Sequence, residues 1–239
     1  MNDGVRRLVD PFLADVDAAL GTTYTAVLFG SAARGDYVSG TSDVNLMLII
    51  ERAEPEELAR LRPAFARWRK AAAGLPLVIS RDEWLHGVDV FPIEICDLRA
   101  AHQVLRGPDL VAPLKPRPAD LRRALEKEFR GKLLRLRQRY AAHGEEDLGR
   151  WAGGTIAAIV MFFRCLLTLT GRPAPAEPSR VIEGAGALLG FEPAPLLRVL
   201  ACRTAPKATL AASDFEAYLA AVEKAAQFTD QLELGDLDS

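Results

Sequence analysis

The 239-residue sequence contains little cysteine, few aromatic side chains and almost no net charge. Its three cysteines, Cys96, Cys165 and Cys202, match neither a disulfide framework nor a zinc-binding spacing. Their apolar surroundings predict buried, reduced thiols. Phe, Trp and Tyr together make up 7% of the residues. The net charge is −2, so the whole chain is not expected to be a general binder of polyanions.

A long hydrophobic run is also missing. The most apolar segment, residues 155–170, is interrupted by Arg164 and is shorter than the roughly 20 residues that span a bilayer. The first residues, MNDGVRRLVDPF, contain no apolar signal core. Together with the reduced cysteines, these features predict a cytoplasmic protein with no membrane partner.

The charge and the prolines divide the chain into two parts. Residues 1–112 carry 12 Lys/Arg against 16 Asp/Glu, whereas residues 113–239 carry 18 against 16. Between these parts, the segment APLKPRP (residues 112–118) holds three prolines and cannot continue a helix. We therefore expect one domain over residues 1–112 and a second over residues 113–239.

The first part alternates helix and strand patterns, which predicts an α/β domain with a small mixed sheet. Ser80 and Glu83 have the spacing of a capping box, so a short helix should begin there. Asp97 is a plausible N-cap of a later helix. The expected elements are helices at 5–20, 55–73 and 97–105, and strands at 24–29, from 42 onward, at 77–80 and at 91–96.

The second part has helical patterns throughout. Apolar residues recur every three or four positions from Leu121 to Tyr140, which predicts one long helix with an apolar stripe. Ser213 can cap the last helix, with Glu216 three residues later. Further helices are expected at 147–170, 179–189, 194–202 and 214–232. This part should therefore form an all-α helical bundle.

One stretch, residues 28–48, reads LFGSAARGDYVSGTSDVNLML. An apolar strand ends at Gly30, and Ser31 opens a short turn. Glycine lets the backbone approach a phosphate closely, and the backbone N–H groups that follow can bind an anion. Asp43 and Asn45 alternate by two, so both side chains leave the same face of the second strand. The pattern predicts a phosphate-binding turn beside a metal ligand.

Gly30-Ser31, Arg34-Gly35 and Ser42-Asp43 resemble the signature of the polymerase-beta-type nucleotidyltransferases. The resemblance is to the small bacterial branch that includes aminoglycoside nucleotidyltransferases, whose pattern is G-S-x-x-R-G followed by S-D-x-D. It implies an α/β (α+β) nucleotidyltransferase domain followed by a helical bundle. It also implies Mg²⁺-dependent or Mn²⁺-dependent transfer of a nucleoside monophosphate from an NTP, with ATP expected, to a hydroxyl-bearing acceptor.

The resemblance also assigns residues to the site. Gly30, Ser31, Arg34 and Ser42 would bind the nucleotide, Asp43 and Glu94 would be the catalytic carboxylates, and Asp43, Asn45 and Glu94 would hold the metal. A charged Glu94 within the expected strand FPIEIC is costly unless a bound cation, an exposed edge or an arginine compensates it. Asp97, three positions later, should then face the other side of that strand.

The departure from the family pattern is Asn45, which replaces the second aspartate. An amide oxygen can coordinate Mg²⁺, but as a dipole without a full charge, so the metal that activates the acceptor should bind more weakly. The alternative is therefore a catalytically degenerate nucleotide-binding or regulatory protein of the same fold. For Arg34 two roles stay open, a contact with phosphate or a salt bridge to Asp36 or Asp43 that braces the turn.

The expected long helix is strongly basic. Residues 113–143 hold 10 basic and 3 acidic side chains, which fits either a solvated helix face or a wall that meets an anionic ligand. The acceptor, small or macromolecular, is not identified by any motif. The sequence does not determine the oligomeric state, and a homodimer is one of the partner arrangements left open.

Overall fold

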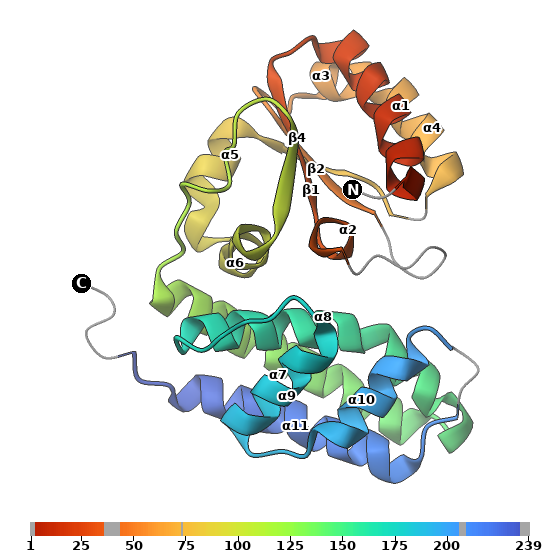
Figure 1. The fold of residues 1–239 in the computed structure, drawn as a ribbon, viewed down its shortest axis with the longest axis vertical. Coiled ribbons are helices and arrows are strands. Elements are labelled where there is room, and N and C mark those ends of the chain that lie inside the picture. Colours follow the sequence, from red (N-terminus) through yellow and green to blue (C-terminus); the bar gives the residue numbers. More distant parts are fainter. Residues whose placement is uncertain (1–2, 36–43, 73, 206–208, 235–239) are drawn as a thin grey trace. The chain divides into compact units, whose positions relative to one another are not determined.

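The structure, a computed structural model, describes residues 3–35, 44–72, 74–205 and 209–234 (Figure 1). The chain separates into two compact units, Met1–Lys115 and Pro116–Ser239. The boundary between the units, after Lys115, lies inside the proline-rich segment 112–118, and no helix or strand crosses this boundary. Each unit has its own hydrophobic core.

The first unit is built on a four-stranded sheet with the order β3-β2-β1-β4. Its strands are β1 (Tyr24–Phe29), β2 (Asn45–Ile50), β3 (Leu77–Ser80) and β4 (His102–Arg106). Strand β1 is antiparallel to both β2 and β4, whereas β2 and β3 are parallel. The sheet is therefore mixed, and β1 lies in its interior with partners on both sides.

Both faces of this sheet are covered by helices, as Figure 1 shows. Side chains of a strand alternate between faces, and here Leu28 and Leu48 pack toward α1 (Asp3–Leu20) and α4 (Arg62–Ala71). Val27, Met47 and Ile49 pack on the other face, toward α5 (Arg81–His86) and α6 (Pro92–Ala100). Double burial explains why β1 and β2 read as continuous apolar runs.

Two of the predicted elements of this unit are wrong. The segment expected as a strand at 91–96 is helix α6, with Pro92 in its first turn, a position that suits proline. The helix expected at 97–105 ends instead at Ala100, and His102–Arg106 forms β4. A short apolar run has no periodicity that separates strand from helix, which is why FPIEIC was misassigned.

Other local predictions hold or need small changes. The capping box of α5 is confirmed, because Ser80 N–H donates to Glu83 Oε2 at 2.9 Å and Glu83 N–H donates to Ser80 Oγ at 3.2 Å. The helix expected at 55–73 consists of α3 (Pro55–Arg60) and α4, which meet at Leu61. A short 3₁₀ turn, η1 (Gly87–Asp89), joins α5 to α6.

The second unit is an all-α bundle, as predicted. Its elements are α7 (Pro118–Ala142), η2 (Glu145–Asp147), α8 (Leu148–Leu169), α9 (Pro178–Leu189), α10 (Pro193–Cys202) and α11 (Ala212–Gln231). Helix α8 is central, since Ile156, Phe163 and Leu166 are all 0% exposed. The predicted cap Ser213 is wrong, because α11 begins at Ala212 and its N-cap is Ala211 without a side-chain hydrogen bond.

Within the described residues, one helical segment, Glu145–Leu169, is long and apolar enough by length and composition to cross a membrane. It is longer than the run of residues 155–170 that the sequence suggested. However, 61% of its most apolar window is buried inside the unit, and the core helix of a bundle meets the same criterion. This is weak evidence for a membrane span.

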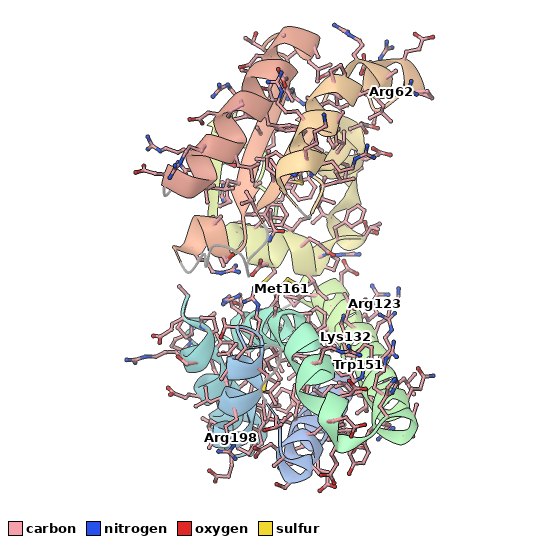
Figure 2. The ribbon with its side chains drawn as sticks, turned by 90° about the vertical axis from the view of Figure 1, so that its right-hand side faces the viewer. Arg62, Arg123, Lys132, Trp151, Met161 and Arg198 are labelled. Atoms are coloured by element: carbon pink, nitrogen blue, oxygen red, sulfur yellow. The ribbon has the colours of Figure 1, made fainter. Side chains whose placement is uncertain are left out.

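Half of the basic residues of α7 form ion pairs with acidic neighbours. Arg130 Nε lies 2.9 Å from Glu126 Oε1, and Arg137 lies 2.7 Å from Glu223 of α11. The Arg139 guanidinium lies 3.9 Å from the centre of the Trp151 ring of α8. Figure 2 labels Arg123, Lys132 and Trp151 on the side of the bundle that faces the viewer. These pairs favour the interpretation of α7 as a solvated face.

Two helical glycines of the bundle should respond oppositely to alanine. A Cβ at Gly186 of α9 would lie 2.8 Å from the Phe191 carbonyl oxygen, whereas a Cβ at Gly154 of α8 has no atom within 4 Å. Gly186→Ala should therefore lower the free energy of unfolding by about 1–3 kcal/mol. Gly154→Ala should raise it by roughly 0.5–1 kcal/mol, because alanine favours the helix. Urea unfolding measures both, and destabilisation by Gly154→Ala would contradict this packing.

Candidate functional site

The centre of the candidate site is the turn that follows β1. Gly30 has φ 69° and ψ −149°, a backbone region that is essentially restricted to glycine. Its carbonyl oxygen accepts the N–H groups of Ala33 at 3.2 Å and Arg34 at 3.0 Å, which starts the four-residue helix α2 (Ser31–Arg34). A Cβ at Gly30 would lie 2.4 Å from Asn45 Nδ2, so a larger residue would strain the backbone and would also force the Asn45 side chain to move.

The sheet register places Phe29, Asn45 and His102 next to one another at the same end of three adjacent strands. Phe29, the last residue of β1, is opposite Asn45 in β2 and opposite His102 in β4. The Asn45 side chain thus covers Gly30 from the neighbouring strand. Ser42 and Asp43, the predicted nucleotide and metal ligands, lie outside the described residues, and so does the distance between Asp43 and Glu94.

A buried ion pair connects this turn to α6. The Arg34 guanidinium Nη1 lies 3.1 Å from Asp97 Oδ1 and 3.3 Å from Asp97 Oδ2. The two side chains are only 12% and 7% exposed, so their charges are largely removed from water. The bracing role considered for Arg34 is thus present, but with a partner 63 positions away. Asp36 and Asp43, the partners expected from the sequence, are among the residues that the structure does not describe.

The reassignment of α6 changes two predictions. Asp97 is not an N-cap, because it lies inside the helix and is 5% exposed. Glu94 does not lie on a strand, and its position on α6 is exposed, so burial in the sheet no longer argues for a bound cation. Residues three apart on a helix share a side, so Glu94 and Asp97 are neighbours rather than opposed. The role of Glu94 as a ligand stays a prediction.

His102 contributes a second polar connection at the same sheet edge. Its Nδ1 lies 2.8 Å from the Leu98 carbonyl oxygen, and its Nε2 lies 3.1 Å from Asp109 Oδ2. A carbonyl and a carboxylate only accept hydrogen bonds, so both bonds form together when both ring nitrogens carry a proton. Asp109 also accepts the N–H groups of Val111 at 2.8 Å and Ala112 at 3.0 Å.

These contacts set the protonation of Asp109. Partial burial by itself raises the pKa of this carboxyl, but the N–H donors of Ala112 and Val111, together with His102, outweigh it and hold the pKa below its ordinary value. Asp109 therefore stays charged and ties the start of β4 to the segment that leads into the second unit. No sequence pattern predicts this pair, because neither residue belongs to a recognisable motif.

The described part of the site does not contain a complete metal-ligand set. Across residues 3–35, 44–72, 74–205 and 209–234, no group of three or more His, Cys, Asp or Glu side chains is placed to hold a metal ion. Asn45 supplies one amide, and the carboxylate ligands predicted from the sequence, Asp43 and Glu94, stay predictions. A cavity of about 250 Å³ in this unit, lined partly by Tyr24 and Ile50, lies at the opposite end of β1 and β2.

The chain matches no known protein family and no curated protein sequence. Its fold is similar to that of the spectinomycin adenyltransferase AAD(9) from Enterococcus faecialis, whose structure was solved with ATP and spectinomycin. The TM-score is 0.58 and the identity 11%, over 94% of this chain and 99% of that chain. The chain has a nucleotidyltransferase-like fold. The predicted fold class is thereby confirmed, and at this identity the likeness concerns the fold alone.

Within this nucleotidyltransferase-like fold, removing one partner of the Arg34–Asp97 pair should lower stability more than removing both. Asp97→Ala leaves a buried guanidinium without its carboxylate and should lower the free energy of unfolding by about 3–5 kcal/mol. The double variant Arg34→Met/Asp97→Leu should recover most of that loss. Arg52→Gln, which breaks exposed pairs in the same unit, should cost less than about 1 kcal/mol. Urea denaturation measures these free energies of unfolding. A smaller loss of stability for Asp97→Ala than for Arg52→Gln would refute the buried pairing.

The depressed pKa of Asp109 predicts a pH effect. Because its pKa is lower in the folded chain, the carboxylate stabilises the fold above its unfolded pKa of about 4, and this contribution is lost as the pH falls through the folded value. Asp109→Asn should therefore lower stability at pH 6 and flatten its decline below about pH 4. Thermal unfolding at a series of pH values measures the difference, and parallel curves for the two proteins would contradict it.

Proposed function

We propose that the protein is a nucleotidyltransferase that transfers a nucleoside monophosphate from an NTP, with ATP as the expected donor, to a hydroxyl-bearing acceptor. The observation that carries the proposal is the conformation of Gly30. At the end of an interior strand of a nucleotidyltransferase-like fold, it adopts a backbone geometry restricted to glycine and lies directly against Asn45. A strained glycine at such a position is typical of a close backbone approach to a ligand.

In this proposal the chain's own residues bind and orient the triphosphate. The backbone at Gly30 and Ser31 would meet the phosphate oxygens, with Ser42 as a further donor. Arg34 would act through its bond to Asp97, holding α2 in place beside the phosphates. Asp43 and Asn45 would hold Mg²⁺ or Mn²⁺, with Glu94 as a further candidate ligand. The metal would neutralise charge on the phosphates.

The second candidate is a nucleotide-binding protein without turnover, and a specific feature supports it. Asn45 offers a neutral amide where the family pattern has a carboxylate, and the charge of Arg34 is already neutralised by Asp97. Both features reduce the electrostatic driving force for catalysis while leaving a surface for phosphate. Under this alternative the protein senses or regulates through nucleotide binding.

Calorimetry with ATP and Mg²⁺, followed by a pyrophosphate-release assay over an acceptor panel, tests both candidates. The native chain should bind ATP, and Gly30→Ala should weaken binding by about tenfold or more, because the added Cβ displaces Asn45 and strains the backbone. Asn45→Asp should tighten metal-dependent ATP binding by about tenfold, since a full charge replaces a dipole. If Asn45→Asp also produces turnover that the native chain lacks, the native protein is the second candidate, a nucleotide-binding protein without turnover.

A matched control separates the site from general strain. Gly21 follows α1 with φ 68° and has no atom within 4 Å of an added Cβ, so Gly21→Ala places a Cβ on a positive-φ backbone away from the site. This variant should lose stability but retain ATP affinity. Absence of ATP binding by the native chain would exclude both candidates, and equal affinity of native and Gly30→Ala proteins would exclude the role of the turn.

A further inference from the structure

The second unit contains a cavity that the proposed transfer reaction does not use. It has a volume of about 470 Å³ and is formed by the end of α8, the segment of residues 172–175 and one side of α9. This volume is within the range of about 300–1,000 Å³ found for sites that hold small molecules. The site is built entirely within one unit, so it does not depend on the turn at Gly30.

The inner lining of the cavity is apolar. Leu167, near the end of α8, lines the cavity and is 1% exposed. From α9 the cavity is lined by Gly184 and Ala187, which lie on one side of the helix with Arg180 because residues three and four apart share a face. The absence of side-chain bulk at Gly184 leaves the space open, since a Cβ there would already lie 3.2 Å from Leu167 Cδ1.

A buried arginine holds the cavity wall. Arg164 of α8 is 3% exposed, and its guanidinium donates to the carbonyl oxygens of Pro175 at 3.2 Å and Ala176 at 3.0 Å. Burial of a guanidinium is costly unless its donors are used, and here they fix a segment already stiffened by Pro173 and Pro175. The wall is therefore preorganised, which reduces the entropy lost when a ligand binds.

The charged groups that line the cavity have one sign. Arg172 and Arg180 both line it and both are exposed, so their guanidinium groups lie toward the solvent side. No acidic residue belongs to the lining, and the Glu177 carboxylate lies 3.7 Å from Arg180 Nε in a pair whose side chains are each about two-thirds exposed. Such an exposed pair is weak and can be replaced by a ligand anion.

We propose that this cavity binds a small amphiphilic anion, whose apolar part fills the space over Leu167 and Gly184 and whose carboxylate or comparable acidic group pairs with Arg172 and Arg180. Neither a neutral nor a cationic molecule of the same shape satisfies both parts of the lining. The site would give the helical unit a binding activity of its own, independent of the nucleotide.

The test uses the full-length chain and three probes of equal chain length: octanoate, 1-octanol and octylammonium. Isothermal titration calorimetry should show one octanoate per chain. Octanol should bind about fivefold more weakly, the size expected for one or two solvent-exposed ion pairs, and octylammonium more weakly still. Equal binding of octanoate and octylammonium, or no octanoate binding at millimolar concentration, would overturn the proposal.

Two variants locate the site. Gly184→Leu places a side chain in the cavity on a helix that leucine favours, and it should abolish binding of octanoate and octanol alike. Arg172→Gln/Arg180→Gln alters only exposed side chains and should lower octanoate affinity to that of octanol. Arg135→Gln, an exposed arginine of α7 outside the lining, should change neither. Unchanged octanoate affinity in both test variants would place the binding elsewhere and refute the assignment.

Discussion

The buried ion pair between Arg34 and Asp97 is the contact on which the geometry after β1 depends. Helix α2 has only four residues, and so short a helix is not stable by its own hydrogen bonds. The guanidinium at its last residue is held by both carboxylate oxygens of Asp97, which α6 in turn carries against the sheet. A buried pair adds little net stability but imposes a severe penalty when one member is lost. Its effect here is therefore positional: it fixes where the backbone after Gly30 runs.

The local pattern of apolar residues was sufficient to predict those elements that bury a regular run or stripe of side chains. Helix α7 follows from apolar residues at a constant period, strand β1 and helix α8 from continuous apolar runs, and the α5 cap from two residues three apart. The sequence failed where long-range contacts decide the conformation. FPIEIC is helical because Ile95 and Leu98 cover one face of the sheet, and β4 is an edge strand with half-exposed residues whose only strong constraint is pairing with β1. Neither cause can be read from a short window of sequence.

In the candidate site too, local spacing predicted some residues, whereas long-range contacts decided others. Gly30 and Asn45 were found from spacing, since the motif and the register of an antiparallel pair together place them side by side. The partner of Arg34 was not, because the sequence offered the nearby Asp36 and Asp43, whereas Asp97 is 63 positions away. The error at Glu94 has the same origin: on a strand Asp97 would have opposed it, but on α6 the two are neighbours, one exposed and one buried.

Charge at this sheet edge is balanced within the described residues, and this limits how a triphosphate would be held. Arg34 is matched by Asp97, and the His102 ring lies 3.1 Å from Asp109 through Nε2. Because the charge of Arg34 is already paired, attraction of a phosphate would rest on backbone N–H groups and on a metal ion. Asn45 then becomes decisive: an aspartate there would strengthen a cation's binding, whereas the amide leaves the negative charge to the predicted carboxylate ligands Asp43 and Glu94. A site with this balance favours binding that depends steeply on metal concentration.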